Sequence, residues 1–183
     1  MLSRWSSVLA LALGSLALAG CSAADEGGAS NASGAQSPLV GAQAPEISAE
    51  TVTGEGPKTL KDASGKVVIV DFWATYCDPC KKSFPKYQAL VDQFGGELAV
   101  IGVSVDDPDD AKKEQLEQFV KSTGVKFSIV WDKDKSAAKR YSPPKMPSSY
   151  IIDKQGVVRH LHAGYTDGEE NKIATEIKEL LGK

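Results

Sequence analysis

The chain has 183 residues and a formal net charge of −3, with 24 acidic residues against 21 Lys and Arg. This balance gives no basic surface to argue for nucleic-acid binding, and no internal repeat is evident. The length fits a single domain behind an N-terminal leader.

The first 20 residues have the pattern of an export signal. Arg4 precedes an apolar run over residues 8–19, which is too short and too weakly flanked to favour a transmembrane helix. The run ends in Leu18-Ala19-Gly20-Cys21, which resembles the bacterial lipobox, where cleavage precedes a lipidated cysteine. We predict a lipoprotein signal peptide over residues 1–20 and lipidation of Cys21. The alternatives are an ordinary signal peptide that leaves an unmodified cysteine, and a cytosolic protein with an apolar start.

Residues 21–38 are predicted to form a flexible tether. After Cys21 they are rich in Ala, Ser and Gly and contain no aromatic or large aliphatic residue, so they cannot bury enough apolar surface to fold. A chain of this kind reaches on the order of 20 Å. The globular domain is then expected over residues 39–183.

The domain is expected to open with a hairpin. Two extended pieces, residues 41–47 and 54–60, are joined by Gly and Pro turns, which is consistent with a small N-terminal hairpin that covers a sheet edge. Residues 64–66 then form a turn into the next strand.

A strand, a tight turn and a helix follow around the two remaining cysteines. The β-branched run Val67–Val70 predicts a strand buried on both faces. The spacing of one helix face is then kept by Cys80, Phe84, Tyr87, Val91 and Phe94, and Gly95-Gly96 supplies the stop. Cys77 is therefore predicted at a helix N-terminus, where the helix dipole and free N–H groups favour a thiolate. Cys80, about one turn on, is then close enough to attack a mixed disulfide formed by Cys77.

Two less specific interpretations of the cysteine pair fit poorly. A zinc site of the ribbon type needs a second cysteine pair, yet the only other cysteine in the sequence is Cys21. A C-x-x-C disulfide closes a very short loop, so it stabilises a fold little. The strand-turn-helix context therefore favours redox chemistry.

The rest of the chain alternates strands and helices. Strands are predicted over residues 98–105, 127–131, 148–152 and 157–163, and helices over residues 111–122, 135–141 and 167–181. The acidic run Asp106–Asp110 is expected to be a solvated turn and helix N-cap rather than a metal loop, because it lacks the Gly-containing calcium pattern. His160 and His162 alternate on one strand and so share a face. We expect packing or surface roles for them rather than metal ligation.

Several short motifs stand together from about Pro45 onward. They are Asp71-Phe72-Trp73-Ala74, Cys77-Asp78-Pro79-Cys80-Lys81, Pro85 within a helix, Met146-Pro147 before an apolar strand, and Gly164 near the end of the last strand. In these motifs the chain resembles the thioredoxin-like thiol-disulfide oxidoreductases, and within them the ResA/TlpA-like group of the bacterial cell envelope. The resemblance implies an α/β thioredoxin-like fold with a central mixed sheet flanked by helices. It also implies a cis Met146–Pro147 bond, and a helix-strand insertion before the strand that follows it.

The resemblance further implies roles for single residues. Cys77 is the expected nucleophile and Cys80 the resolving thiol, and no cofactor is expected beyond the redox-active disulfide that they form. Asp71 stands where thioredoxin carries a buried acid, so it is expected to exchange a proton with Cys80; a capping or surface aspartate is the alternative. The expected substrate contacts are Trp73, Tyr76, Asp78, Pro79, Met146 and Pro147. The chain departs from thioredoxin in having Tyr76 for a tryptophan and Asp78 for a glycine, and in having no obvious lysine to accompany Asp71.

The leading hypothesis is a membrane-tethered enzyme that reduces disulfides of cell-envelope proteins outside the cytoplasm. That compartment is oxidising, so a membrane thiol-disulfide electron donor is an expected partner. One alternative is a thiol-based copper chaperone of cytochrome oxidase assembly, which would use Cys77, Cys80 and a histidine as soft ligands. Another is a peroxiredoxin-like thiol peroxidase, although the usual Pro-x-x-x-Thr-x-x-Cys pattern is absent.

Overall fold

The structure is a computed structural model that describes residues 37–183. The predicted signal peptide, Cys21 and all but the end of the predicted tether lie outside the described residues. The strands are β1 (Glu50–Thr53), β2 (Val67–Trp73), β3 (Leu98–Ser104), β4 (Ser128–Trp131), β5 (Ser148–Ile152) and β6 (Val158–Ala163). The helices are α1 (Asp78–Phe94), α2 (Lys113–Thr123), α3 (Ser136–Tyr141) and α4 (Glu169–Leu181), with a 3-10 turn η1 (Gly95–Glu97) after α1. Most of these bounds lie within two residues of those predicted from the pattern.

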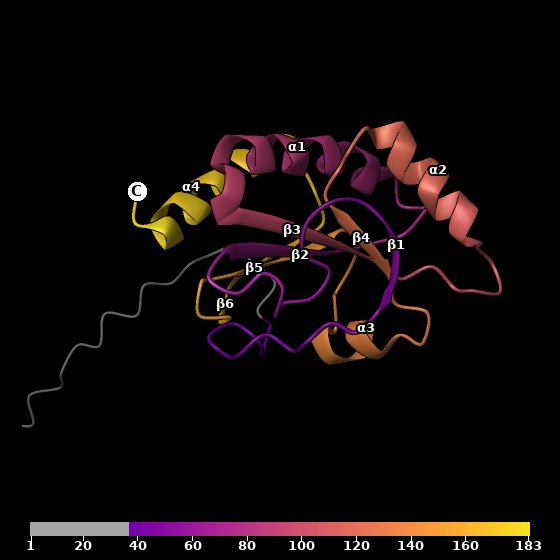
Figure 1. Ribbon diagram of the computed structural model, residues 1–183, viewed down its shortest axis with the longest axis horizontal. Coiled ribbons are helices and arrows are strands. Elements are labelled where there is room, and N and C mark those ends of the chain that lie inside the picture. The colour runs from indigo at the N-terminus through magenta and orange to yellow at the C-terminus, as the bar shows by residue number, and fades with distance from the viewer. Residues whose placement is uncertain (1–36) are drawn as a thin grey trace, which may run out of the picture. The chain divides into compact units, whose positions relative to one another are not determined.

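The six strands form one mixed sheet in the order β1-β4-β3-β2-β5-β6. The central strand β2 pairs in parallel with β3 and antiparallel with β5. Every residue of β2 and β3 is buried, because helices cover both faces of the sheet: α1, α2 and α4 lie on one side and α3 on the other (Figure 1). This confirms the thioredoxin-like fold and the strand buried on both faces.

Side chains of β2 alternate between two core clusters. Ile69 and Trp73 pack with residues of α1, α2 and α4, whereas Val70 and Phe72 pack with residues of α3. Because successive side chains in a strand point to opposite faces, Asp71 points to the same side as Ile69 and Trp73. The central strand thus carries one acidic side chain into the apolar layer beneath α1.

The predicted insertion is present between β3 and α3. It consists of α2 and β4, and β4 lies between β3 and the edge strand β1. The core side of α2 is formed by Leu116, Phe119 and Val120, as the spacing predicted. Gly124 ends the helix in the left-handed conformation, with φ 71°, which suits glycine because it has no Cβ.

The predicted N-terminal hairpin is wrong. Within the described domain, the pieces over residues 41–47 and 54–60 do not pair with each other. The residues between them form β1, which pairs antiparallel with β4, while Gln43 bridges to Val157 near β6. The segment spreads over the α3 side of the sheet because Ile47 is buried in the core there, and the Pro45 carbonyl accepts a hydrogen bond from Tyr141 Oη at 2.7 Å.

Candidate active site

Cys77 caps the N-terminus of α1. Its backbone is extended, with φ −90° and ψ 97°, and its Sγ accepts a hydrogen bond from the Cys80 backbone N–H at 3.2 Å. The two cysteines are joined by a disulfide, with their Cα atoms 5.3 Å apart. The prediction that Cys77 stands at the helix N-terminus is therefore confirmed. In the reduced protein, the same N–H group and the helix dipole would favour a thiolate at Cys77 over one at Cys80.

The surroundings of the two cysteines differ in exposure. Cys77 is 6% exposed and Cys80 is fully buried, so an incoming disulfide can reach Cys77 more readily than Cys80. Tyr76, immediately before Cys77, is 69% exposed, and Asp78 and Pro79 are exposed as well. Asp78 forms an ion pair with Lys81 at 3.2 Å, and this ion pair partly offsets the repulsion between the carboxylate and a Cys77 thiolate.

The Met146–Pro147 peptide bond is cis, as the resemblance implied. Met146 is partly exposed and packs against the core cluster that contains Cys77 and Cys80. Pro147 is buried, and its carbonyl accepts a hydrogen bond from the Gly164 N–H at 2.7 Å. The start of β5 is thereby fixed next to the apolar layer under the disulfide.

Asp71 is fully buried beneath α1. Its Oδ1 accepts a hydrogen bond from Ser149 Oγ at 2.6 Å, while its Oδ2 has no hydrogen-bond partner among residues 37–183. Burial raises the pKa of Asp71 to about 8, although the hydrogen bond from Ser149 opposes the shift. The carboxyl group is therefore mostly protonated at neutral pH and gains a charge just above it.

Trp73 has no exposed surface, so in this conformation it cannot contact a partner as the sequence suggested. Its ring stacks on Phe119 with a centroid distance of 4.6 Å and meets Phe84 edge-on at 5.1 Å. Its position supports a packing role, in which Trp73 fills the layer between β2 and the two helices α1 and α2.

Asp106 differs from the expectation for its acidic run. Only 2% of it is exposed, and its carboxylate accepts hydrogen bonds from the Thr75 N–H at 3.0 Å and from Ser104 Oγ at 2.8 Å. The Thr75 hydroxyl donates to the same carboxylate. The prediction of a solvated turn is thus wrong for Asp106, because its side chain turns inward to hold the loop that precedes Cys77.

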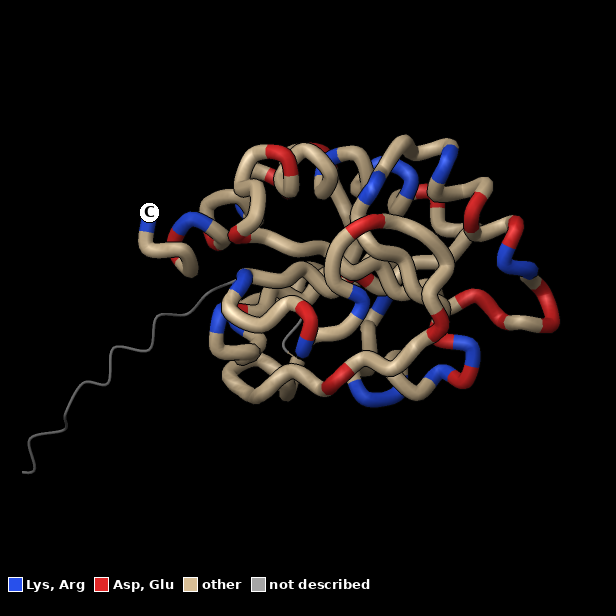
Figure 2. Tube along the Cα trace, in the orientation of Figure 1, with Lys and Arg blue, Asp and Glu red and all other residues tan. Residues whose placement is uncertain are grey.

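The rest of the acidic run is exposed, apart from the partly exposed Pro108. In Figure 2 acidic positions gather in this loop between β3 and α2, whereas basic and acidic residues are interspersed elsewhere along the described trace. A hollow of about 350 Å³ lies between this loop and the turn before Cys77, and its lining includes Tyr76, Asp107 and Asp110. The hollow beside the turn thus combines exposed carboxylates with the exposed ring of Tyr76, and Lys135 also lines it.

The two histidines share a face of β6, as predicted, and that face meets α4. The His162 ring lies between two carboxylates, with Nδ1 3.0 Å from Glu169 Oε1 and Nε2 2.7 Å from Glu176 Oε2. His160 Nδ1 is 3.6 Å from the other oxygen of Glu176. Burial opposes the charge on His162, but the bonds to Glu176 and Glu169 prevail and raise its pKa. In the described part of the chain, no group of three or more His, Cys, Asp and Glu side chains is arranged to hold a metal ion.

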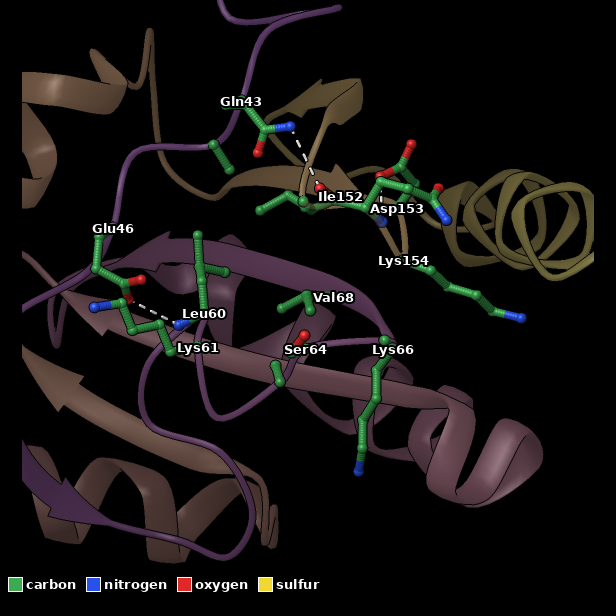
Figure 3. A pocket seen from close by; sticks show the side chains of 15 residues that line it. Gln43, Glu46, Leu60, Lys61, Ser64, Lys66, Val68, Ile152, Asp153 and Lys154 are labelled. Carbon is green, nitrogen blue, oxygen red and sulfur yellow. Dashed lines mark hydrogen bonds between the residues drawn. The ribbon is translucent and has the colours of Figure 1, made fainter.

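A second hollow, of about 210 Å³, lies at the opposite end of the sheet (Figure 3). Its walls include Val68 at the start of β2 and Ile152 at the end of β5, whereas Cys77 follows the end of β2. Glu46 binds the Leu60 N–H there at 2.9 Å. Figure 3 shows the side chains of Lys66 and Lys154 extending away from the hollow. The hollow therefore has no cluster of lysine side chains pointing into it from Lys66 and Lys154. The hydrogen bond between Glu46 and Leu60 instead attaches the N-terminal segment to the loop before β2.

The fold and the cysteine pair together define a class of protein, the thioredoxin-like thiol-disulfide oxidoreductases. A disulfide between the N-cap of the first helix after the central strand and the next turn of that helix is the feature on which this class depends. The model of the AhpC/TSA family matches residues 40–161, and the chain belongs to that family.

Two curated relatives and one solved structure agree with this class. Thioredoxin-like protein YneN of Bacillus subtilis (strain 168) is 36% identical over 117 residues, which span 64% of this chain and 67% of that protein. Thiol-disulfide oxidoreductase ResA of Bacillus thuringiensis (strain Al Hakam) is 36% identical over 106 residues, which span 57% of this chain and 59% of that protein. The crystal structure of a protein named as a thiol:disulfide interchange protein DsbE, from Chlorobium tepidum, superposes with a TM-score of 0.69 at 28% identity, covering 78% of this chain and 98% of that one.

Some functional residues were not evident from the sequence. Ser149 and Tyr87 complete the surroundings of Asp71, and Asp106 holds the turn before Cys77. For Asp106 the sequence shows only that it follows an apolar strand almost directly, which does not reveal that its carboxylate reaches Thr75. For Ser149 no local signal exists, because its importance depends on which residue of β2 it faces.

Proposed function

We propose that the protein is a membrane-tethered thiol-disulfide oxidoreductase that reduces disulfides of envelope proteins outside the cytoplasm. The observation that carries the proposal is the placement of Cys77 at the N-cap of α1, more exposed than Cys80 and accepting a hydrogen bond from the Cys80 N–H. The names of ResA and of the DsbE structure support thiol-disulfide exchange as the reaction.

In the proposed reaction, the Cys77 thiolate attacks one sulfur of a substrate disulfide. A mixed disulfide forms at Cys77, and the other substrate sulfur leaves as a thiolate. Cys80 then loses its proton to Asp71 and attacks Cys77 Sγ, which forms the Cys77–Cys80 disulfide and releases the second substrate sulfur. Two electrons have passed to the substrate. A membrane thiol-disulfide donor must then reduce Cys77–Cys80 again, since the compartment is oxidising.

Substrate contact is proposed for the residues around the disulfide. Tyr76, Asp78 and Pro79 flank Cys77 at the surface, and the partly exposed Met146 and the buried Pro147 come directly before β5. An extended segment of the partner would pair with the backbone at Met146 and so lie beside Cys77. Because most contacts would be to backbone, one enzyme of this kind could accept several partners.

The membrane tether rests on the sequence alone. Among residues 37–183, no helix is both long and apolar enough to cross a membrane. We propose that lipid on Cys21 holds the domain at a membrane surface, for which two acyl chains suffice, whereas a single chain binds only weakly and reversibly. Cys21→Ser should release the protein from the membrane or stall its processing. Mass spectrometry that finds an unmodified Cys21, or cleavage elsewhere, would rule out the anchor.

The roles of the two sulfurs are tested by trapping. Cys80→Ser removes the resolving thiol, so mixed disulfides with partner proteins should accumulate through Cys77 and appear as bands that a reductant abolishes. Cys77→Ser is the matched control and should trap few partners, because Cys80 is fully buried. If Cys77→Ser traps partners and Cys80→Ser does not, the assigned roles are reversed.

A further inference from the structure

Three buried polar side chains form a chain of hydrogen bonds beneath α1. Tyr87 Oη lies 2.7 Å from Ser149 Oγ, and Ser149 Oγ lies 2.6 Å from Asp71 Oδ1. Each of the three residues is at most 1% exposed. Ser149 faces Asp71 directly in the register of β5 and β2, so the pairing of the strands itself brings the two side chains together.

The direction of this chain follows from its protons. Ser149 has one hydroxyl proton, and it must donate this proton to an ionised Asp71, because a carboxylate only accepts. Tyr87 must then donate to Ser149. Burial, and after it the charge of Asp71, raises the pKa of Tyr87 well above its ordinary value, so the phenol keeps its proton. Tyr87 therefore donates to Ser149, and Ser149 donates to Oδ1 of Asp71.

The second oxygen of Asp71 is available to accept a proton. Oδ2 is buried and has no hydrogen-bond partner in the part of the chain that the structure describes. Since Ser149 occupies Oδ1, an arriving proton is carried by Oδ2. Cys80 and Tyr87 lie on the buried face of α1, seven residues apart, in the core cluster above β2.

We propose that Tyr87 and Ser149 are positioning residues for Asp71, and that their hydrogen-bond chain fixes the carboxyl group so that Oδ2 exchanges a proton with Cys80. The inference rests on the proposed function for the identity of the proton donor. Ser149 stands two residues after Pro147, and Tyr87 stands on the helix that Cys77 caps. These hydrogen bonds therefore connect Asp71 to helix α1 and to the start of β5, the two segments that are expected to contact a substrate.

Other polar groups lie on this face, among them Ser83 of α1, which is buried and hydrogen-bonds to Tyr87 in a way that lowers the pKa of Tyr87. Glu169 of α4 is close enough for its charge to act on Tyr87, and His162 of β6 faces Ser149 in register and pairs with Glu169 and Glu176. On the other side of Asp71, the paired residue of β3 is Gly102, which has no side chain. Any pH effect assigned to Asp71 must therefore be separated from titration of the His162 cluster.

The first test follows Asp71 itself in the purified, oxidised full-length protein. The carboxyl ¹³C resonance of Asp71, assigned by its loss in Asp71→Asn, is titrated by NMR. Ser149→Ala should raise the midpoint by about one pH unit, because a hydrogen bond to the ionised form is lost. Tyr87→Phe should raise it by less, and Ser149→Thr should restore it.

Matched controls exist on another strand, β4, and on the opposite face of β5. Ser128 is a buried serine that donates to the Glu55 carbonyl at 2.8 Å, and Tyr150 is a buried tyrosine that donates to the Tyr141 carbonyl at 2.7 Å. Ser128→Ala and Tyr150→Phe should leave the Asp71 midpoint unchanged. Equal shifts in the controls, or an unchanged midpoint in Ser149→Ala, would overturn the hydrogen-bond chain. If Ser149→Ala does not fold, the Asp71 midpoint in Tyr87→Phe is compared with that in Tyr150→Phe, and this comparison alone tests the proposal.

The second test separates the chain from the reaction. The rate at which Cys80 resolves a mixed disulfide on Cys77 is measured by stopped flow across pH. Ser149→Ala and Tyr87→Phe should shift the midpoint of this profile as they shift the NMR midpoint, and should shift nothing in an Asp71→Asn background. An NMR shift without a kinetic shift would overturn proton exchange at Oδ2 and the proposed role of Asp71. Kinetic shifts that persist in Asp71→Asn would show that the two residues act on another group.

Discussion

Replacing Asp71 by Asn removes the buried titrating group while its size and one acceptor oxygen remain. The side-chain carbonyl of the introduced Asn can still accept the hydrogen bond from Ser149 that Asp71 Oδ1 now accepts. Any cost of burying the amide NH₂ group is the same at every pH. The pH dependence of stability therefore isolates the ionisation of Asp71.

The magnitude follows from the pKa of Asp71, which burial raises from 3.8 to about 8. Because the folded-state pKa is the higher one, the folded protein holds a proton that the unfolded chain has released at every pH between these values. The stability from protonated Asp71 is fully present below pH 3.8, and it is lost as the pH rises toward 8. The slope is about 1.4 kcal/mol per pH unit, so the free energy of unfolding falls by about 4 kcal/mol between pH 4 and pH 7.

The assay is urea unfolding of the oxidised protein and its Asp71→Asn variant at several pH values from about 4 to about 9. The difference in unfolding free energy should grow in favour of the variant up to about pH 8 and then level off. Asp132→Asn is the matched control, because Asp132 is a buried aspartate whose carboxylate accepts from the Ala137 and Ala138 N–H groups at the start of α3. It should not reproduce this trend.

Activity provides the second half of the prediction. At pH 7 about one tenth of Asp71 is ionised if its pKa is about 8, and Asn has no such form. Insulin disulfide reduction should therefore slow by about tenfold or more in Asp71→Asn and lose its rise through pH 8. A pH-independent stability difference would refute the raised pKa. Matching pH–rate profiles would reduce Asp71 to a structural residue.

Two further predictions concern Asp106 and His162. Asp106→Ala leaves the Thr75 N–H without its acceptor and should lower the free energy of unfolding by about 3 kcal/mol, with Asp106→Asn recovering part of it; an unchanged urea midpoint would show that the turn before Cys77 needs no such anchor. His162 has a raised pKa in the folded state, so its bonds to Glu176 and Glu169 stabilise the fold fully below an unfolded-state pKa of about 6.5 and less as the pH rises through the folded value. The stability advantage of the wild type over His162→Gln should therefore shrink with rising pH, and an advantage that grows would contradict the charged pairing.

Much of the fold could be predicted because its signals are local. The central strand, the helix behind Cys77 and its stop at Gly95 each follow from spacing within a few residues, and the structure has them as predicted. The N-terminal hairpin failed for the opposite reason. Short extended pieces take whichever sheet edge tertiary packing offers, and here β4 offered that edge to β1.

In the candidate site, too, the residues placed by local structure could be predicted, and those placed by tertiary contacts could not. The positions of Cys77 and Cys80 depend on one strand-turn-helix unit, so the sequence predicted them. The partners of Asp71 depend on register, because a slip of one residue would turn Ser149 away from Asp71. Asp106 shows the same limit: no local pattern tells which carboxylate of an acidic run reaches back to Thr75.

The inserted α2–β4 unit has a consequence for shortening this protein. Trp131 at the end of β4 donates to the Asp106 carbonyl at 2.9 Å, and Lys135, just beyond β4, donates to the Val105 and Asp106 carbonyls at 2.7 and 2.6 Å. Asp106, which anchors the turn before Cys77, is therefore held in place by hydrogen bonds from the end of β4 and from Lys135. A chain trimmed to the size of a minimal thioredoxin would retain both cysteines and Asp71. It would lose the hydrogen bonds that Trp131 and Lys135 donate to the backbone at Asp106. The α2–β4 insertion is therefore needed to hold the turn before the disulfide in place.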